Sequence, residues 1–172
     1  MLNIDAGICR LRAVEPSDLE LMYLWENDPD VWRVSGTLAP ISRERLARFI
    51  EEQSYDIYAT RQMRLIIEVE GVMVGTVDVC DFDPQNLRFG IGVLVYASDN
   101  RRCGYAKAAI EAVKRYGEQT LFVRQIWASV AADNDASIAL FEACGFERCG
   151  VRREWLRRTA GFVDEIEFQY LF

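Results

Sequence analysis

The sequence predicts an α+β fold: a mixed, mostly antiparallel twisted sheet with a central parallel strand pair and flanking helices. Three observations indicate this class. Strands in the first half are separated by turn signals at Glu70-Gly71 and at residues 83–86. A strand, a helix and another strand then follow over residues 87–131, the order that pairs two strands in parallel. The chain finishes on two strands that predict a hairpin, and residues 1–172 are interpreted as a single domain.

The first 60 residues predict one strand and two helices. Residues 8–14 alternate moderately and indicate a strand. A helix is expected after Pro16-Ser17-Asp18, where an apolar stripe begins. The stripe consists of Leu19, Leu21, Met22, Leu24 and Trp25. Asn27-Asp28-Pro29 ends this helix, and a polar segment without a regular element is expected as far as Ser42. Residues 46–57 predict a second helix.

The strands that follow have the clearest pattern. Leu65–Val69 is rich in β-branched residues and is expected to form a hairpin with Val72–Val79 across Glu70-Gly71. Residues 83–86 form the next turn. Every second residue from Leu87 to Val95 is then apolar, which predicts a strand with one buried face.

The second half continues with two helices and three strands. The expected elements, in order, are a helix over 106–116, a strand over 124–131, a short helix over 135–144, and hairpin strands over 146–155 and 164–172. Asn134 is placed to cap the short helix, and Gly145 stands where a helix commonly ends.

Composition narrows the classes of function. The formal net charge is −7, whereas proteins that bind nucleic acid usually present a basic face, so no nucleic acid partner is expected. No apolar run reaches the roughly 18 residues of a membrane helix, and no signal peptide is recognised, so a cytoplasmic protein without membrane contact is expected. The five cysteines are expected to be reduced thiols. The chain has no histidine, which removes histidine bases and the common histidine-containing zinc sites, and no metal is expected.

One loop carries a chemical signal. Asn100–Ala106 joins the clearest strand to the next helix. The first N–H groups of a helix lack partners within it, and the helix dipole is positive at this end, so such a loop can bind phosphate. Gly104 allows close approach of the main chain to a ligand, while Arg101 and Arg102 add positive charge. The expected ligand is a phosphate or pyrophosphate.

The loop resembles the acetyl-CoA signature of the GNAT superfamily of N-acetyltransferases, Arg/Gln-x-x-Gly-x-Gly/Ala. It reads Arg101-Arg102-Cys103-Gly104-Tyr105-Ala106. A second segment, Asn134–Phe146, resembles the Asn-x-x-Ser/Ala … Gly-Phe segment of that family, and the order of elements agrees along nearly the whole chain. Trp25–Pro29 and Asn134-x-x-Ser137 are similar to the branch of ribosomal-protein N-terminal and polyamine acetyltransferases.

The resemblance implies a GNAT-like fold and acetyl-CoA as co-substrate. The pantetheine arm is then expected along the main chain of Val93, Leu94 and Val95. The pyrophosphate is expected on Arg101, Arg102, Cys103, Gly104, Tyr105 and Ala106. Asn134 and Ser137 are expected to contact the arm from the other side. Main-chain N–H groups near Leu94 would stabilise the developing oxyanion, and an acceptor amine would attack directly while both substrates are held together.

One residue departs from the family pattern. Many relatives carry, at position 141, a tyrosine that protonates the departing thiolate, whereas this chain has Phe141, which we interpret as a core residue. Ser137, with Tyr105, Tyr96 or water as alternatives, is the candidate to supply that proton, unless the thiolate leaves unprotonated.

Two carboxylates are candidates for the general base that takes the proton of the acceptor ammonium: Asp81 and Glu26. Asp78 has the opposite strand parity to Asp81, so only one of these two is expected to face the site.

Three functions remain open from the sequence. The first is acetylation of a small amine such as a polyamine, favoured by the acidic composition and by carboxylates near the expected pocket. The second is acetylation of protein N-termini or lysines, which the Trp25–Pro29 segment indicates. The third is a non-catalytic acetyl-CoA-binding protein, which Phe141 indicates. The resemblance also implies a homodimer, for which the final strand is expected to offer an edge.

Overall fold

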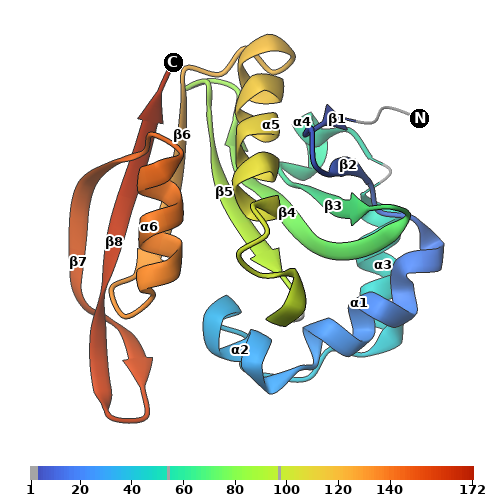
Figure 1. The fold of residues 1–172 in the computed structure, drawn as a ribbon, viewed down its shortest axis with the longest axis horizontal. Helices are drawn as coiled ribbons and strands as arrows, with labels where there is room; N and C mark the ends of the chain where they lie inside the picture. The colour runs from blue at the N-terminus through green and yellow to red at the C-terminus, as the bar shows by residue number, and fades with distance from the viewer. Residues whose placement is uncertain (1–3, 54, 97) are drawn as a thin grey trace.

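The computed structural model describes residues 4–53, 55–96 and 98–172 (Figure 1). Its first elements are β1 (Ile4–Asp5), β2 (Arg10–Ala13), the 3-10 turn η1 (Pro16–Asp18), α1 (Leu19–Glu26), α2 (Pro29–Ser35), α3 (Arg43–Glu52), α4 (Ile57–Thr60), β3 (Met63–Val69) and β4 (Val72–Asp83). The remaining elements are β5 (Arg88–Val95), the 3-10 turn η2 (Ser98–Asn100), α5 (Tyr105–Gln119), β6 (Gln125–Ala131), α6 (Asp135–Ala143), β7 (Glu147–Arg158) and β8 (Gly161–Leu171). No helix in these ranges is long and apolar enough to cross a membrane.

The strands of these ranges form one sheet in the order β1-β2-β3-β4-β5-β6-β8-β7. Every neighbouring pair is antiparallel except β5 and β6, which run parallel. The predicted fold class and its central parallel pair are therefore confirmed.

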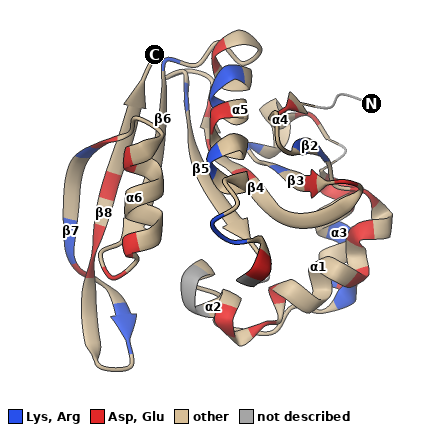
Figure 2. Ribbon diagram, in the orientation of Figure 1, with Lys and Arg blue, Asp and Glu red and all other residues tan. Residues whose placement is uncertain are grey.

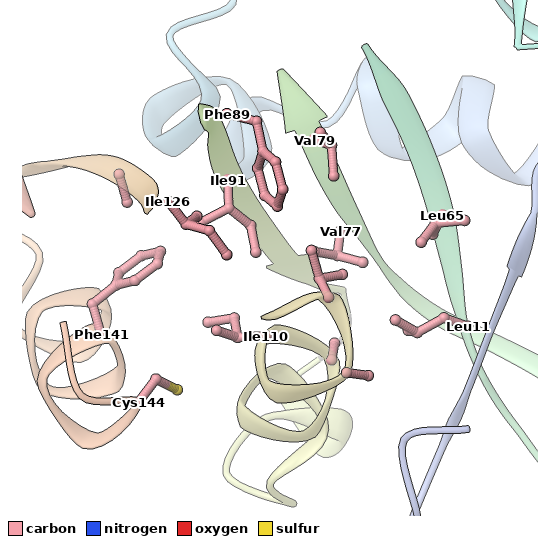
Figure 3. Packing of buried hydrophobic residues seen from close by; sticks show 14 of the residues in the cluster. Leu11, Leu65, Val77, Val79, Phe89, Ile91, Ile110, Ile126, Phe141 and Cys144 are labelled. Carbon is pink, nitrogen blue, oxygen red and sulfur yellow. The ribbon is translucent and has the colours of Figure 1, made fainter. Parts of the chain in front are cut away.

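Apolar side chains cover both faces of the sheet. On one face, α5 packs on alternate residues of β4 and β5, among them Val77 and Ile91, and α6 extends this core (Figure 3). On the other face, α1 and α3 pack around Ile66 of β3. Because successive strand residues point to opposite faces, the even-numbered residues from Thr76 to Cys80 and from Gly90 to Leu94 lie on the α1 face.

Helix α2 was missed by the sequence interpretation. Asp28 caps it by accepting a hydrogen bond from the Asp30 N–H, Pro29 takes its first position, and Gly36 follows its last residue with a φ of 72°. Boundary signals were thus present, but seven residues are too few to show a helical repeat. The expected helix over 46–57 is also divided, because α3 ends at Glu52 and Asp56 caps the separate α4.

The final strand does not offer an edge, so that expectation was wrong. β8 is hydrogen-bonded to β6 on one side and to β7 on the other. At this end of the sheet the edge strand is β7, because the chain leaves β6 through α6, runs outward as β7 and returns between β6 and β7 as β8. A homodimer stays a prediction.

Candidate active site

β5 and β6 pair over a short stretch and then separate. Arg88–Gly90 pairs with Gln125–Trp127, whereas residues 91–95 pair, among the described strands, with β4 alone. Figure 1 shows the two strands diverging toward the ends from which the chain continues to α5 and α6. We call the side of residues 91–95 that turns away from β4 the free edge. It lies at the carboxyl ends of two parallel strands, the position where open α/β sheets bind ligands.

The free edge presents main-chain groups of Val93 and Val95. The Tyr96 N–H donates to the Val74 carbonyl of β4 over 2.9 Å, and the Leu94 carbonyl also points to β4, against Gly75. Since antiparallel pairing alternates, the N–H and C=O groups of Val93 and Val95 point the other way. The Val95 carbonyl accepts a hydrogen bond from Arg101 Nε at 3.4 Å. The donors near Leu94 are thus those of its two neighbours.

The loop before α5 has the form of an anion site. Arg102 and Gly104 have φ angles of 63° and 85°, on either side of Cys103. Main chain that alternates in handedness turns its N–H groups to one side and forms an anion-binding concavity, and the first N–H groups of α5 follow directly. Residues 101–104 are exposed, and Figure 2 shows the blue of Lys and Arg in this loop. The geometry is that of an anion-binding loop, and its expected role toward the pyrophosphate of acetyl-CoA stays a prediction.

The start of α6 follows the end of β6. Asn134 is the N-cap of α6, and its Oδ1 accepts a hydrogen bond from the Ser137 N–H at 3.1 Å. Ser137 is half-buried. Both residues therefore belong to the end of α6 nearest the diverging strands, but their roles toward a ligand stay predictions.

Phe141 is a core residue, as expected. Its side chain is buried, and Figure 3 shows it within the core. Its ring centroid lies 5.1 Å from that of Phe146 and 6.0 Å from that of Phe168.

Arg64 joins two carboxylates on the α1 face. Its Nε and Nη2 donate to Asp78 at 2.6 and 3.0 Å, and its Nη1 donates to Glu26 at 2.5 Å. Burial opposes the charge of Arg64, but Asp78 and Glu26 outweigh burial and raise the pKa of Arg64 above its ordinary value, so the guanidinium stays charged. We call these three residues the Arg64 cluster. With both carboxylates ionised its net charge is −1.

Asp81 lies apart from the Arg64 cluster. The register of β4 against β5 shifts between Cys80 and Asp83, and Asp81 has a φ of 48°. Strict alternation of side chains therefore stops before Asp81, and it does not decide which face of the sheet Asp81 occupies. Asp81 is exposed and lines a shallow depression of about 410 Å³ together with Asp83, Arg88, Trp127 and Arg152. Of the two candidate bases, only Glu26 belongs to the Arg64 cluster, where Asp78 accompanies it.

The geometry agrees with the comparison to known families. The family profile described as "Acetyltransferase (GNAT) domain" matches residues 9–147. The chain belongs to this GNAT acetyltransferase family. Among its relatives, the uncharacterized N-acetyltransferase p20 of Bacillus licheniformis is 25% identical over 164 residues, which cover 94% of this chain and 91% of that protein. The SPbeta prophage-derived uncharacterized N-acetyltransferase YokL of Bacillus subtilis (strain 168) is 28% identical over 160 residues, covering 92% and 86%. The GNAT protein described here is an N-acetyltransferase.

Solved structures of this family share the fold. The spermidine N-acetyltransferase of Vibrio cholerae in complex with CoA and spermine matches with a TM-score of 0.86 and 19% identity, over 96% of each chain. The apo structure of the ribosomal L7/L12 alpha-N-protein acetyltransferase RimL matches with a TM-score of 0.83 and 16% identity, over 99% of this chain and 94% of that chain. At these identities the likeness establishes the GNAT fold.

Arg64 was not identified from the sequence as a site residue of this GNAT protein. A usable signal was present, because a charged residue beside the apolar run Leu65–Ile67 implies a partner on a neighbouring strand. The identity of that partner depends on register: Arg64 lies directly opposite Asp78 across β3 and β4.

Proposed function

We propose that this GNAT protein transfers the acetyl group of acetyl-CoA to a primary amine of a small polycationic acceptor, with polyamines as the expected class. One observation carries the proposal: β5 separates two regions of opposite charge. The basic loop and the N-terminus of α5 follow its free edge, and the Arg64 cluster lies on its α1 face. An anionic co-substrate and a cationic acceptor would thereby meet at one strand.

The residues around the free edge fit acetyl-CoA. The concavity formed by residues 101–104 and the first turn of α5 offers N–H donors to the pyrophosphate, and Arg101 and Arg102 add charge. Acetyl-CoA supplies an activated thioester. The N–H groups of Val93 and Val95 are the donors that can polarise the thioester carbonyl at the free edge.

Direct transfer balances without an acyl group on the protein. The amine nitrogen forms a bond to the acetyl carbon, the carbon–sulfur bond breaks, and CoA leaves as a thiolate. The acceptor must first lose its ammonium proton to water or to a carboxylate, for which Glu26 and Asp81 are the candidates. The bonded nitrogen then loses its second proton, and a hydroxyl such as that of Ser137 can relay a proton to the thiolate, so that the products are the amide and the CoA thiol.

A second cluster of acidic residues favours an acceptor with more than one positive charge. The depression on the α1 face contains Asp81, Asp83, Arg88 and Arg152. Arg88 pairs with Asp83 at 3.3 Å, while Arg152 pairs with Glu165 and Glu167 at 2.9 and 3.3 Å. With four ionised carboxylates against two guanidinium groups, this region has a net charge of −2. The spermine present in the structurally similar Vibrio cholerae enzyme is of the same ligand class.

The test is acetylation of a mixed panel of polyamines, aminoglycosides, amino acids and peptides by the purified protein with acetyl-CoA, read by mass spectrometry. We expect acetylated polyamines. Products from peptides alone would support the protein acetyltransferase alternative. Acetyl-CoA binding, measured by calorimetry, with no product from any amine would support the non-catalytic alternative.

A variant of the loop of residues 101–104 tests the acetyl-CoA side of the proposal. Gly104 has a φ of 85°, and a Cβ there would lie 3.3 Å from Ile8. Gly104→Val is therefore expected to weaken acetyl-CoA binding and turnover together.

A further inference from the structure

Gly92 is a strand glycine without a structural requirement for glycine. Its φ is not in the left-handed region, and a Cβ added to it would have no described neighbour within 4 Å. Other glycines of the sheet differ. A Cβ on Gly90 would meet the Trp127 ring at 2.7 Å and the Cys80 sulfur at 2.8 Å, and a Cβ on Gly75 would collide with the Leu94 carbonyl. Glycine inside a strand weakens it and often marks a place where a ligand approaches closely.

The space over Gly92 opens on the α1 face. Gly92 has the parity of Gly90 and Leu94, whereas Ile91 and Val93 pack on the side of α5. Along β5, the Trp127 ring covers Gly90 on one side of this space. On the other side, beyond Leu94, the Trp25 ring is stacked on Tyr96. The half-buried stretch of β5 at Gly92 and Leu94 is thus bounded by aromatic side chains at both ends.

The same space adjoins a negative charge and the free edge. Asp78 lies directly opposite Gly92 in the β4–β5 register, and Arg64 holds its carboxylate. Val93, whose N–H and C=O point to the free edge, is the next residue in β5. A small group over Gly92 would therefore touch both the Arg64 cluster and the expected position of the thioester.

We propose that the acceptor amine reaches the thioester through the open space over Gly92, with its ammonium group held by Asp78. This rests on the proposed function. Gly92 is then a specificity-determining residue, which admits an unbranched primary amine. Arg64 is a positioning residue, which keeps the Asp78 carboxylate at the opening.

The test compares Gly92→Ala and Gly92→Val with Gly150→Ala. Gly150 lies in β7, where a Cβ would make only an ordinary contact with Glu167 at 3.7 Å, so this control makes the same change in a strand away from the opening. The readouts are the melting temperature, the Kd of acetyl-CoA by calorimetry, and kcat and KM for the best amine of the panel.

We expect Gly92→Ala to melt no lower than the parent, because alanine suits an extended strand better than glycine. Its Kd for acetyl-CoA should stay within about twofold while the KM for the amine rises about tenfold, and Gly92→Val should lower kcat/KM about 100-fold or more. Asp78→Asn should raise the KM for the amine, with Asp78→Glu recovering part of the loss. Gly150→Ala should keep the parental melting temperature, Kd for acetyl-CoA and kcat.

Two results would overturn the proposal. If Gly92→Val has the parental KM and kcat, the amine does not pass over Gly92. If both Gly92 variants lose acetyl-CoA affinity in proportion to activity, the space serves the co-substrate. A parent that neither binds nor acetylates any amine of the panel would refute the proposed function itself, before any variant is made.

Discussion

Trp25 stacks on Tyr96, with ring centroids 3.6 Å apart and 11° between the ring planes. Trp25 lies in the last turn of α1 and Tyr96 directly follows β5, so this contact fixes the helix end that carries Glu26 against the strand end that carries the free edge. Burial first, and the nearby Glu26 second, raise the pKa of Tyr96. The Tyr96 hydroxyl therefore stays protonated, and its raised pKa makes it a weaker acid than an ordinary tyrosine.

Replacing Trp25 with alanine should affect both stability and acceptor use. Loss of the stacked ring is expected to lower the free energy of unfolding by about 2 kcal/mol. The KM for the acceptor should rise, because Glu26 and the aromatic boundary of the α1 face lose their fixed position. Urea unfolding and steady-state kinetics measure the two effects. Trp25→Phe keeps a stacked ring and should retain most of the stability and of the affinity for the acceptor. An equal loss in Trp25→Ala and Trp25→Phe would show that the stacked ring is not what matters.

Replacing Arg64 with leucine should be destabilising. The change leaves Glu26 and Asp78 as two like charges without their shared guanidinium. Because the three side chains are only half-buried, we expect a loss of about 1–3 kcal/mol, below that of a fully buried ion pair. Urea unfolding at pH 7 measures the loss. Arg48→Ala is the control, because Arg48 pairs with Glu44 on the surface, where the two side chains are 70% and 76% exposed. A loss at Arg64 as small as that at Arg48 would show that the cluster contributes little to folding.

Stability should fall in acid through two buried carboxylates that share Arg12. Arg12 donates to Asp18 at 2.8 Å through Nη1 and Nη2, and to Glu68 at 2.6 Å through Nε. Burial opposes ionisation of Asp18, but hydrogen bonds from Arg12 and the Glu15 N–H outweigh it and lower the pKa of Asp18. The hydrogen bond from Arg12 is the main cause that lowers the pKa of Glu68.

The sign of this pH dependence follows from the lowered values. Both groups have folded pKa values below their ordinary values of 3.8 and 4.5, so the unfolded chain binds protons more readily. The stability they contribute is present above those ordinary values and is lost as pH falls through the folded pKa values. Urea unfolding between pH 7 and pH 3 should show this loss. In Asp18→Asn and Glu68→Gln the free energy of unfolding should fall less steeply between pH 7 and pH 3 than in the parent. A fall as steep as that of the parent would contradict the role given to these two carboxylates.

Phe141→Tyr should not increase turnover. The ring contacts described for Phe141 are with Phe146 and Phe168, so an added hydroxyl would enter an aromatic environment. We expect a loss of about 1–3 kcal/mol in the free energy of unfolding from the unpaired hydroxyl, with kcat unchanged or lower. Calorimetric melting and kinetics with the best amine measure both. A gain in kcat would show that a tyrosine here reaches the leaving thiolate.

Much of the fold could be predicted because its signals are local. Alternation in residues 87–95, the turn at Glu70-Gly71 and the cap at Asn134 each act within a few residues, and the structure has the corresponding elements. The loop of residues 101–106 was recognised for the same reason. Its geometry, with positive φ at Arg102 and Gly104, agrees with the anion site expected there.

The acceptor side could not be predicted in the same way, because it depends on register between distant strands. Residues 64, 78 and 92 meet only through the pairing of β3, β4 and β5. The parity of Asp81 was lost at a bulge that the sequence does not mark. The place of β8 inside the sheet likewise follows from the path of the chain through α6 and β7.

The narrow junction between β5 and β6 implies that a ligand bound beside it would also stabilise the fold. Three residue pairs join these strands, and the N–H groups of Val93 and Val95 have no described strand beside them on that side, so a ligand can take the place of a neighbouring strand. Whatever binds there in the folded state alone adds RT ln(1 + [L]/Kd) to the stability of the chain, about 2.7 kcal/mol at a hundredfold excess over Kd. If that ligand is acetyl-CoA, as proposed, the protein is expected to resist unfolding and proteolysis better when acetyl-CoA is abundant than when it is scarce.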